Sequence, residues 1–135
     1  MSRGDPPGAV KGLPYSDVIR QRWRHPRFRG RLERATATAE DVNPLCGDRV
    51  RMELRVEDAA VAAARFSGDS CAICTTSADV LSELVTGRSV GDAVALDTPD
   101  LLDILDADVR PTRMRCVTLP LGVMRAALAG GGASA

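Results

Sequence analysis

Residues 48–58 read DRVRMELRVED, and their strict alternation constrains the fold more than any other stretch of the chain. Val50, Met52, Leu54 and Val56 occupy every second position, with charged residues between them. A period of two predicts a β-strand with one buried side. Residues 31–44 alternate more weakly, and residues 60–68 form a third candidate strand after a turn around Glu57 and Asp58. These segments predict a small antiparallel meander with one solvent-facing side.

An N-terminal amphipathic helix is predicted by the spacing of the apolar residues between positions 14 and 25. Tyr15, Val18, Ile19 and Trp23 fall on one helical stripe, and Pro26 ends the pattern. We therefore expect an amphipathic helix at this position.

The second half of the chain has helical periodicity. From residue 70 onward the buried stripe is predicted to consist of Ile73, Ser77, Val80, Leu81 and Leu84. Asp69 or Ser70 is suited to the N-cap of this helix, and Gly87 to its end. Residues 89–111 predict short acidic helical pieces, one of them starting at Asp97 or Thr98. A last helix is expected to start around Pro111 and to be kinked by Pro120. Strands followed by helices predict an α+β fold, with the helices packed on one face of a three-stranded antiparallel sheet.

Length and composition favour one globular domain, because 135 residues with 44% hydrophobic and 27% charged side chains can build a core. We expect that domain to span residues 13–129, with disordered ends at 1–12 and 130–135. A formal net charge of zero and the absence of a recognition motif argue against a nucleic-acid partner. Arginines crowd residues 20–34 and aspartates crowd residues 92–108, which predicts solvated faces or a docking patch for a protein.

The opening residues lack the apolar core of a signal peptide, and no run is long enough for a membrane span. A cytoplasmic protein without a membrane partner is therefore expected. In that reducing compartment, four cysteines favour metal or thiol chemistry over disulfides.

The cysteines leave several kinds of site open. Cys71 and Cys74 have C-x-x-C spacing, which fits half a zinc site, a redox dithiol or chance. Cys46 lies in the turn NPLCGD two residues before Asp48, and Cys116 lies singly near the start of the last helix. Three thiolates and one carboxylate could complete a tetrahedral zinc shell, whereas an isolated intracellular cysteine is commonly a small buried side chain. Cys74 falls on the apolar stripe and is expected to be of that second kind.

Four segments together resemble the NifU/IscU/SufU family of iron–sulfur cluster assembly proteins. They are NPLCGD at 43–48, FSGDSCAI at 66–73, RCVTLP followed by AAL between 115 and 128, and YSDVIRQRWRHPRFRG at 15–30. The resemblance implies a SufE/NifU-like α+β fold and a metal site formed by Cys46, Asp48, Cys71 and Cys116. SufU-like members hold zinc there and relay sulfur from a cysteine desulfurase, whereas IscU-like members build a [2Fe-2S] cluster.

Departures from the family pattern favour the SufU-like reading. Arg115 precedes the last cysteine where IscU-like proteins have histidine, and the chain lacks their Leu-Pro-Pro-Val-Lys motif. The segment between Cys71 and Cys116 is, however, shorter than SufU-like proteins usually have, and Cys74 stands where the family commonly has serine. Arg115 and Cys74 are accessory candidates.

The resemblance thus predicts a zinc-bound sulfur acceptor, similar to a zinc-dependent sulfurtransferase. Cys46 is its expected acceptor, and a cysteine desulfurase and downstream assembly proteins are its expected partners. The alternatives are a [2Fe-2S] scaffold, which would not be an enzyme, a structural zinc module, and a Cys71/Cys74 dithiol oxidoreductase.

Overall fold

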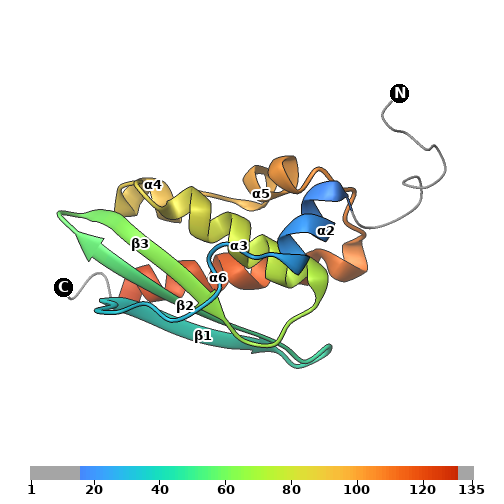
Figure 1. Ribbon diagram of the computed structural model, residues 1–135, viewed down its shortest axis with the longest axis horizontal. Helices are drawn as coiled ribbons and strands as arrows, with labels where there is room; N and C mark the ends of the chain where they lie inside the picture. The colour runs from blue at the N-terminus through green and yellow to red at the C-terminus, as the bar shows by residue number, and fades with distance from the viewer. Residues whose placement is uncertain (1–15, 131–135) are drawn as a thin grey trace.

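The computed structural model describes residues 16–130 and shows a three-stranded antiparallel sheet in the order β1-β2-β3, covered on one face by helices (Figure 1). The strands are β1 (Ala37–Asn43), β2 (Asp48–Glu57) and β3 (Ala60–Ser67). The long helices α3 (Ala72–Val85) and α6 (Met114–Gly130) pack directly on the sheet, α6 against β1 and β2 and α3 against β3. The predicted α+β fold is confirmed.

The alternation in β2 determines which face of the sheet is buried. Val50, Met52 and Leu54 are buried beneath the helices, as the period of two predicts. The opposite face is not uniformly wet, because Glu53 is also buried there and accepts a hydrogen bond from the Leu32 backbone N–H at 2.7 Å. The segment between α2 and β1 therefore covers part of the face that the sequence predicts to be open.

The two hairpin turns differ in backbone conformation. The β2–β3 turn is formed by Asp58 and Ala59, both with positive φ (54° and 62°), one position later than the sequence indicates. The β1–β2 turn contains Gly47 at φ +78° and joins the paired residues Asn43 and Asp48. Its tight closure brings the end of β1 and the start of β2 together at one end of the sheet.

Helix α2 (Asp17–Arg24) is amphipathic to a smaller extent than predicted. Ile19 is buried and Val18 half-buried, but Trp23 is 50% exposed, and Tyr15 lies outside the described residues. A single buried apolar residue suffices because Arg22 also ties the helix down. Its guanidinium donates to the buried carboxylate of Asp79 on α3 at 2.8 Å and also contacts Glu83.

Helix α3 is buried on almost every side, so the predicted stripe is correct but too narrow. Its polar residues Thr75, Thr76, Ser77, Asp79 and Ser82 are all buried. Three of their hydroxyls donate hydrogen bonds to backbone carbonyls of α3 or α2. The Ser77 and Ser82 hydroxyls donate to carbonyls one turn earlier in α3, and the Thr76 hydroxyl donates to the Ile19 carbonyl of α2. The helix is therefore central despite its mixed composition.

Apart from α6, the helices that follow α3 are short. They are α4 (Val90–Val94), α5 (Thr98–Leu105), whose N-cap is Asp97, and the 3₁₀ turn η1 (Pro111–Arg113), which leads into α6. Pro120 lies within α6, and the helix includes Gly130, which the sequence assigns to the tail. The other residues predicted to be disordered, 1–12 and 131–135, lie outside the described part. Within that part, none of the helices is long and apolar enough to span a membrane.

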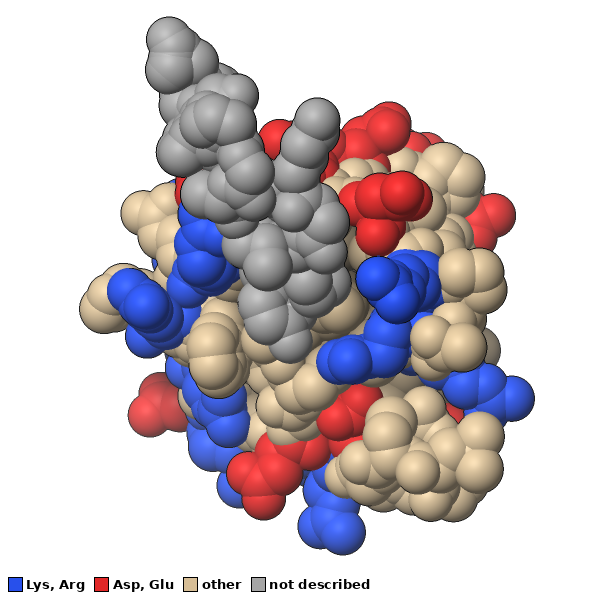
Figure 2. All heavy atoms as spheres, turned by 90° about the vertical axis from the view of Figure 1, so that its right-hand side faces the viewer, with Lys and Arg blue, Asp and Glu red and all other residues tan. Residues whose placement is uncertain are grey.

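The uneven charge distribution along the sequence is visible on part of the surface. In Figure 2, which looks onto the right-hand end of Figure 1, acidic side chains lie along the top, and basic and acidic side chains are mixed in the lower half. The exposed aspartates of α5 and its flanks are Asp97, Asp100, Asp103, Asp106 and Asp108.

Candidate metal centre

Asp48 is positioned by the β1–β2 turn. The Asn43 carbonyl accepts hydrogen bonds from the backbone N–H groups of Cys46 (3.3 Å) and Gly47 (2.7 Å), and the Asn43 side chain accepts one from Leu45 at 3.1 Å. This turn places Asp48, which is 5% exposed, at the first position of β2. The Cys46 thiol donates to Asp48 Oδ2 at 3.2 Å.

Cys71 reaches Asp48 because the chain before α3 passes very close to β2. Gly68 has φ +116°, and a Cβ at this position would meet the Arg49 carbonyl oxygen at 2.3 Å, so glycine is required for this approach. The Arg49 N–H then donates to the Asp69 carbonyl at 2.8 Å. As a result, the Cys71 N–H lies 2.9 Å from Asp48 Oδ1 and donates a hydrogen bond to it.

Cys71 is itself the N-cap of α3, a role that the sequence assigns to Asp69 or Ser70. Its Sγ accepts a hydrogen bond from the Cys74 N–H at 3.4 Å. The prediction of a serine or aspartate cap is wrong here because the hydrogen bond to Asp48 fixes the backbone of Cys71 at the start of the helix. The cysteine sulfur therefore sits at the helix N-terminus.

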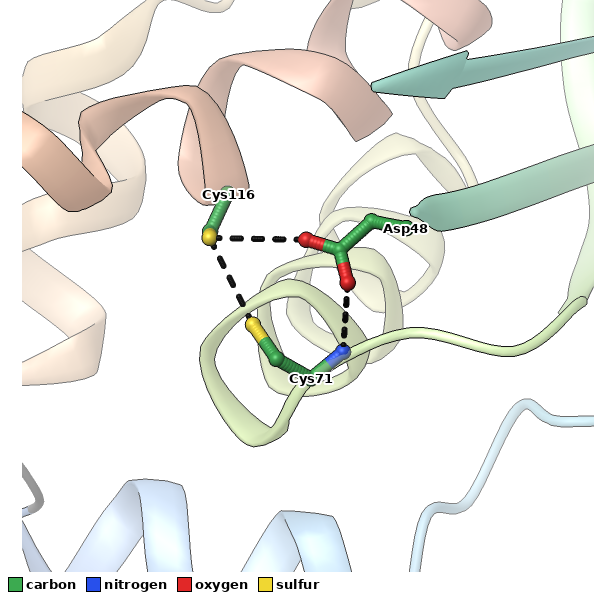
Figure 3. Close-up of side chains that lie close together, drawn as sticks. All are labelled: Asp48, Cys71 and Cys116. Carbon is green, nitrogen blue, oxygen red and sulfur yellow. Dashed lines mark hydrogen bonds between the residues drawn. The ribbon is translucent and has the colours of Figure 1, made fainter. Parts of the chain in front are cut away.

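Cys116, in the first turn of α6, completes a trio with the buried Asp48 and the half-buried Cys71. Its Sγ lies 3.4 Å from Cys71 Sγ and 3.6 Å from Asp48 Oδ2 (Figure 3). One ligand atom each from Asp48, Cys71 and Cys116 lies within 4.8 Å of the others. Residues separated by up to 68 positions in the sequence thus converge, as the metal hypothesis requires.

Cys46, the fourth predicted ligand, lies at the edge of this trio. Its side chain contacts Asp48 Oδ2, but its residue is exposed, whereas Asp48 and Cys116 are buried and Cys71 is half-buried. Cys46 is not part of the trio. Two buried donors and one half-buried donor thus lie together, and one exposed donor lies beside them on a turn.

The trio has the chemistry of a cation site. Burial is the main effect that raises the pKa of the Cys116 thiol, and the neighbouring Cys71 and Asp48 raise it further, whereas Arg113 opposes the shift. Three acidic groups packed this closely therefore need protons or a cation to offset their charge. Sulfur and carboxylate oxygen are both ligands that zinc accepts, so the donor set fits that ion.

Cys74 is buried, as the sequence predicts from its place on the apolar stripe. It is 0% exposed, and burial strongly raises the pKa of its thiol. The next causes of the shift are the negative charges of Asp48 and Cys71, and Cys116 adds a smaller one. Its sulfur therefore lies in the electrostatic field of the trio.

Arg113 interacts with the sulfurs of the trio, and the accessory candidate Arg115 lies at a surface hollow. Hydrogen bonding to Cys116 and then to Cys71 raises the pKa of the Arg113 guanidinium. Arg115 is exposed and lines a surface hollow of about 330 Å³ with residues of β1. Arg113 precedes Cys116 by three residues in a 3₁₀ turn, a spacing that puts both side chains on one face. That spacing is the signal in the sequence that could have identified Arg113.

The surface around Cys46 is apolar as well as accessible. Leu45 is 82% exposed and Val42 is 44% exposed, and Val42 also lines the hollow that contains Arg115. Large apolar side chains exposed beside a reactive group are typical of a protein interaction site.

The described geometry agrees with comparisons to known proteins. The family model of the NifU-like N terminal domain matches residues 14–130. The chain belongs to this family. Its motifs had placed it among the NifU, IscU and SufU proteins of iron–sulfur cluster assembly, and this is confirmed.

Several relatives resemble the chain over most of their length. The iron–sulfur cluster assembly scaffold protein IscU of Thermotoga maritima is 31% identical over 132 residues, covering 86% of this chain and 93% of the relative. The zinc-dependent sulfurtransferase SufU of Bacillus subtilis is 26% identical over 122 residues, covering 78% and 82%.

A solved structure supports the same fold. The crystal structure of a protein from Fervidobacterium islandicum AW-1, described as a scaffold for iron–sulfur cluster assembly in the SUF system, has a TM-score of 0.74 and 25% identity. The match covers 84% of this chain and 96% of that one. Because relatives of both the IscU and the SufU type are found, the family does not by itself decide between their activities.

Proposed function

We propose that the protein is a zinc-bound sulfur acceptor in iron–sulfur cluster assembly. It would take persulfide sulfur from a cysteine desulfurase and pass it to downstream assembly proteins. The observation that carries the proposal is the convergence of three less exposed donors, Asp48, Cys71 and Cys116, beside one exposed thiol, Cys46.

Zinc would be held by Cys46, Asp48, Cys71 and Cys116. When bound, it would keep the cysteines as thiolates without taking part in redox reactions. Asp48, Cys71 and Cys116 would hold the ion from three separate elements, β2, the start of α3 and α6. Arg113 supports this assignment, because its positive charge beside Cys71 and Cys116 offsets part of the negative charge of the ligands.

Cys46 is the residue that would receive the sulfur. Its thiolate attacks the outer sulfur of the donor's persulfide, the donor's sulfur–sulfur bond breaks, and the donor cysteine leaves as a thiolate while Cys46 carries the new persulfide. In the metal-free chain, the hydrogen bond from Cys46 to Asp48 Oδ2 holds the thiol beside the other donors. Its position on an exposed turn also lets Cys46 move, whereas Cys71 and Cys116 are fixed at the beginnings of helices.

The desulfurase would dock on the surface around Cys46. The exposed side chains of Leu45 and Val42 offer an apolar contact, and Arg115 in the adjoining hollow offers a positive charge to an acidic group of the partner. This gives Arg115 a role in partner binding, whereas the charge of Arg113 acts on the sulfurs.

Transfer of labelled sulfur tests the proposal. The purified chain is incubated with a cysteine desulfurase and cysteine, and persulfide on each cysteine is located by mass spectrometry after alkylation. We expect Cys46→Ala to abolish capture and to remain folded, because position 46 is exposed on a turn and has no positive φ. Cys74→Ser is the matched control and should still capture sulfur. Undiminished persulfide on the Cys46→Ala protein would contradict the assignment.

A further inference from the structure

The surface hollow between β1 and α6 contains two opposite charges. Its volume is about 330 Å³, and its lining residues are Asp41, Val42 and Asn43 of β1 and Arg115, Thr118 and Leu119 of α6. This volume lies at the lower end of the range for small-molecule sites, which is roughly 300–1,000 Å³. The hollow therefore suits a ligand of the size of a small amino acid.

The two charges that line the hollow are not paired. Within residues 16–130, neither Asp41 nor Arg115 forms an ion pair, and both residues are exposed. The Asp41 carboxylate accepts a hydrogen bond from the neighbouring Val42 N–H at 2.8 Å, which leaves its negative charge in place. A carboxylate and a guanidinium that stay apart in one hollow can bind the two ends of a zwitterion. Asp41 can accept hydrogen bonds from an ammonium group, and the fork of Arg115 can donate to a carboxylate.

The other lining residues fit the remainder of such a ligand. Val42 and Leu119 provide apolar surface for a short side chain, and Asn43 and Thr118 add polar groups. A few polar groups that converge on a partly apolar hollow are typical of a ligand site.

Asn43 connects the hollow to Cys46. It lines the hollow, and its carbonyl accepts the hydrogen bond from the Cys46 N–H at 3.3 Å. A ligand in the hollow therefore lies beside the exposed turn that carries Cys46. On the basis of the function proposed above, we propose that the hollow binds a small zwitterionic thiol, of the class of free cysteine, and that this thiol removes the sulfur that Cys46 has captured.

The release step balances in atoms and electrons. The thiolate of the bound ligand attacks the outer sulfur of the Cys46 persulfide, a sulfur–sulfur bond forms to the ligand, and the sulfur–sulfur bond at Cys46 breaks. Cys46 leaves as a thiolate and the ligand departs as a persulfide, so one thiolate is consumed and one is formed. The desulfurase and the small thiol use Arg115 in turn, the first during capture and the second during release.

Binding of L-serine tests the hollow without any sulfur transfer, because serine has both charges and a hydroxyl in place of the thiol. In the isotope-labelled chain, we expect saturable shifts of the amide NMR signals of residues 41–43 and 115–119. Ethanolamine, which lacks the carboxylate, and hydroxypropanoate, which lacks the ammonium group, should bind about tenfold more weakly. Arg115→Ala and Asp41→Asn should weaken serine binding to a similar extent. Arg24→Ala, which changes an exposed arginine outside the hollow, is the matched control and should bind serine as the wild type does.

Release kinetics test the role of the ligand. The chain is loaded with sulfur by a cysteine desulfurase, the desulfurase is removed, and the persulfide on Cys46 is followed after a thiol is added. Cysteine should release the sulfur at a saturable rate, and cysteamine and mercaptopropionate, which each lack one charge, should do so about tenfold less efficiently. Arg115→Ala should slow release to cysteine and leave release to cysteamine unchanged, because cysteamine has no carboxylate for the arginine to bind.

The outcomes separate this proposal from the proposed function. If serine gives no saturable shift at these residues, or if all three thiols release the sulfur equally well, the hollow is not a site for a zwitterionic thiol, and the proposed function is unaffected. If serine binds but Cys46 captures no sulfur, the acceptor function is wrong and the release step fails with it. Circular dichroism of the variants checks that weaker binding does not come from unfolding.

Discussion

Replacement of Gly68 by alanine should destabilise the fold and disrupt the candidate metal centre together. At φ +116° any L-residue is strained, at a cost of roughly 1–3 kcal/mol. The added Cβ would also lie 2.3 Å from the carbonyl oxygen of Arg49, a backbone atom that cannot move without shifting β2. Overpacking of this kind adds a further cost of about 1–3 kcal/mol.

Gly87 offers a matched control for this substitution. Its φ is also positive, +91°, but an added Cβ would have no neighbour within 4 Å. Gly87→Ala should therefore carry only the backbone strain, about 1–2 kcal/mol. The difference in the free energy of unfolding between the two variants measures the cost of the close contact between residue 68 and β2.

Urea unfolding of the metal-free proteins measures this difference, and competition with a chelator measures zinc affinity. We expect Gly68→Ala to unfold at lower urea than Gly87→Ala and to bind zinc more weakly. The shift of residues 68–69 moves Cys71 away from Asp48, whereas Gly87 is at the far end of α3. Equal stability and equal zinc affinity of the two variants would refute the reasoning.

Three further outcomes follow from single contacts. Arg22→Ala should lower stability by about 3–5 kcal/mol, because it leaves the buried carboxylate of Asp79 without its ion pair; a urea midpoint equal to that of the wild type would contradict this. Burial raises the pKa of the Cys116 thiol above that of an unfolded thiol, so its contribution to the stability of the metal-free protein should be complete below about pH 8.5. This contribution should be lost as the pH rises further. A melting temperature that increases above about pH 8.5 would argue against it. Leu45→Asp should slow sulfur capture by Cys46 without changing zinc content, and an unchanged rate would exclude Leu45 from the docking surface.

The sheet and most helices were predictable because their signals are local. Alternation in residues 48–58 and glycine or proline at the element ends depend only on neighbouring residues. The motifs also predicted which side chains would lie close together: Asp48, Cys71 and Cys116 converge, and Cys46 lies beside them, while metal binding by these residues stays a prediction. The burial of α3 was harder to predict, because many of its residues are polar. These residues can be buried because their hydroxyls donate hydrogen bonds to carbonyls of α3 itself and of α2.

The departures from prediction arise from tertiary contacts. Trp23 is exposed because the Arg22 ion pairs, rather than a wide apolar stripe, hold α2 in place. Cys71 replaces Ser70 as the helix cap because Asp48, distant in sequence, binds its N–H. Arg113, which was not among the candidates, interacts with the sulfurs because it precedes Cys116 by three residues and lies on the same face.

Metal and sulfide analysis of the protein, purified anaerobically and without an affinity tag, tests the central claim most directly. A sulfur acceptor of the kind proposed should be colourless and contain one equivalent of zinc, with no acid-labile sulfide. A brown protein with iron and sulfide in equal amounts would show that the same residues assemble a [2Fe-2S] cluster, and would contradict the zinc-bound acceptor.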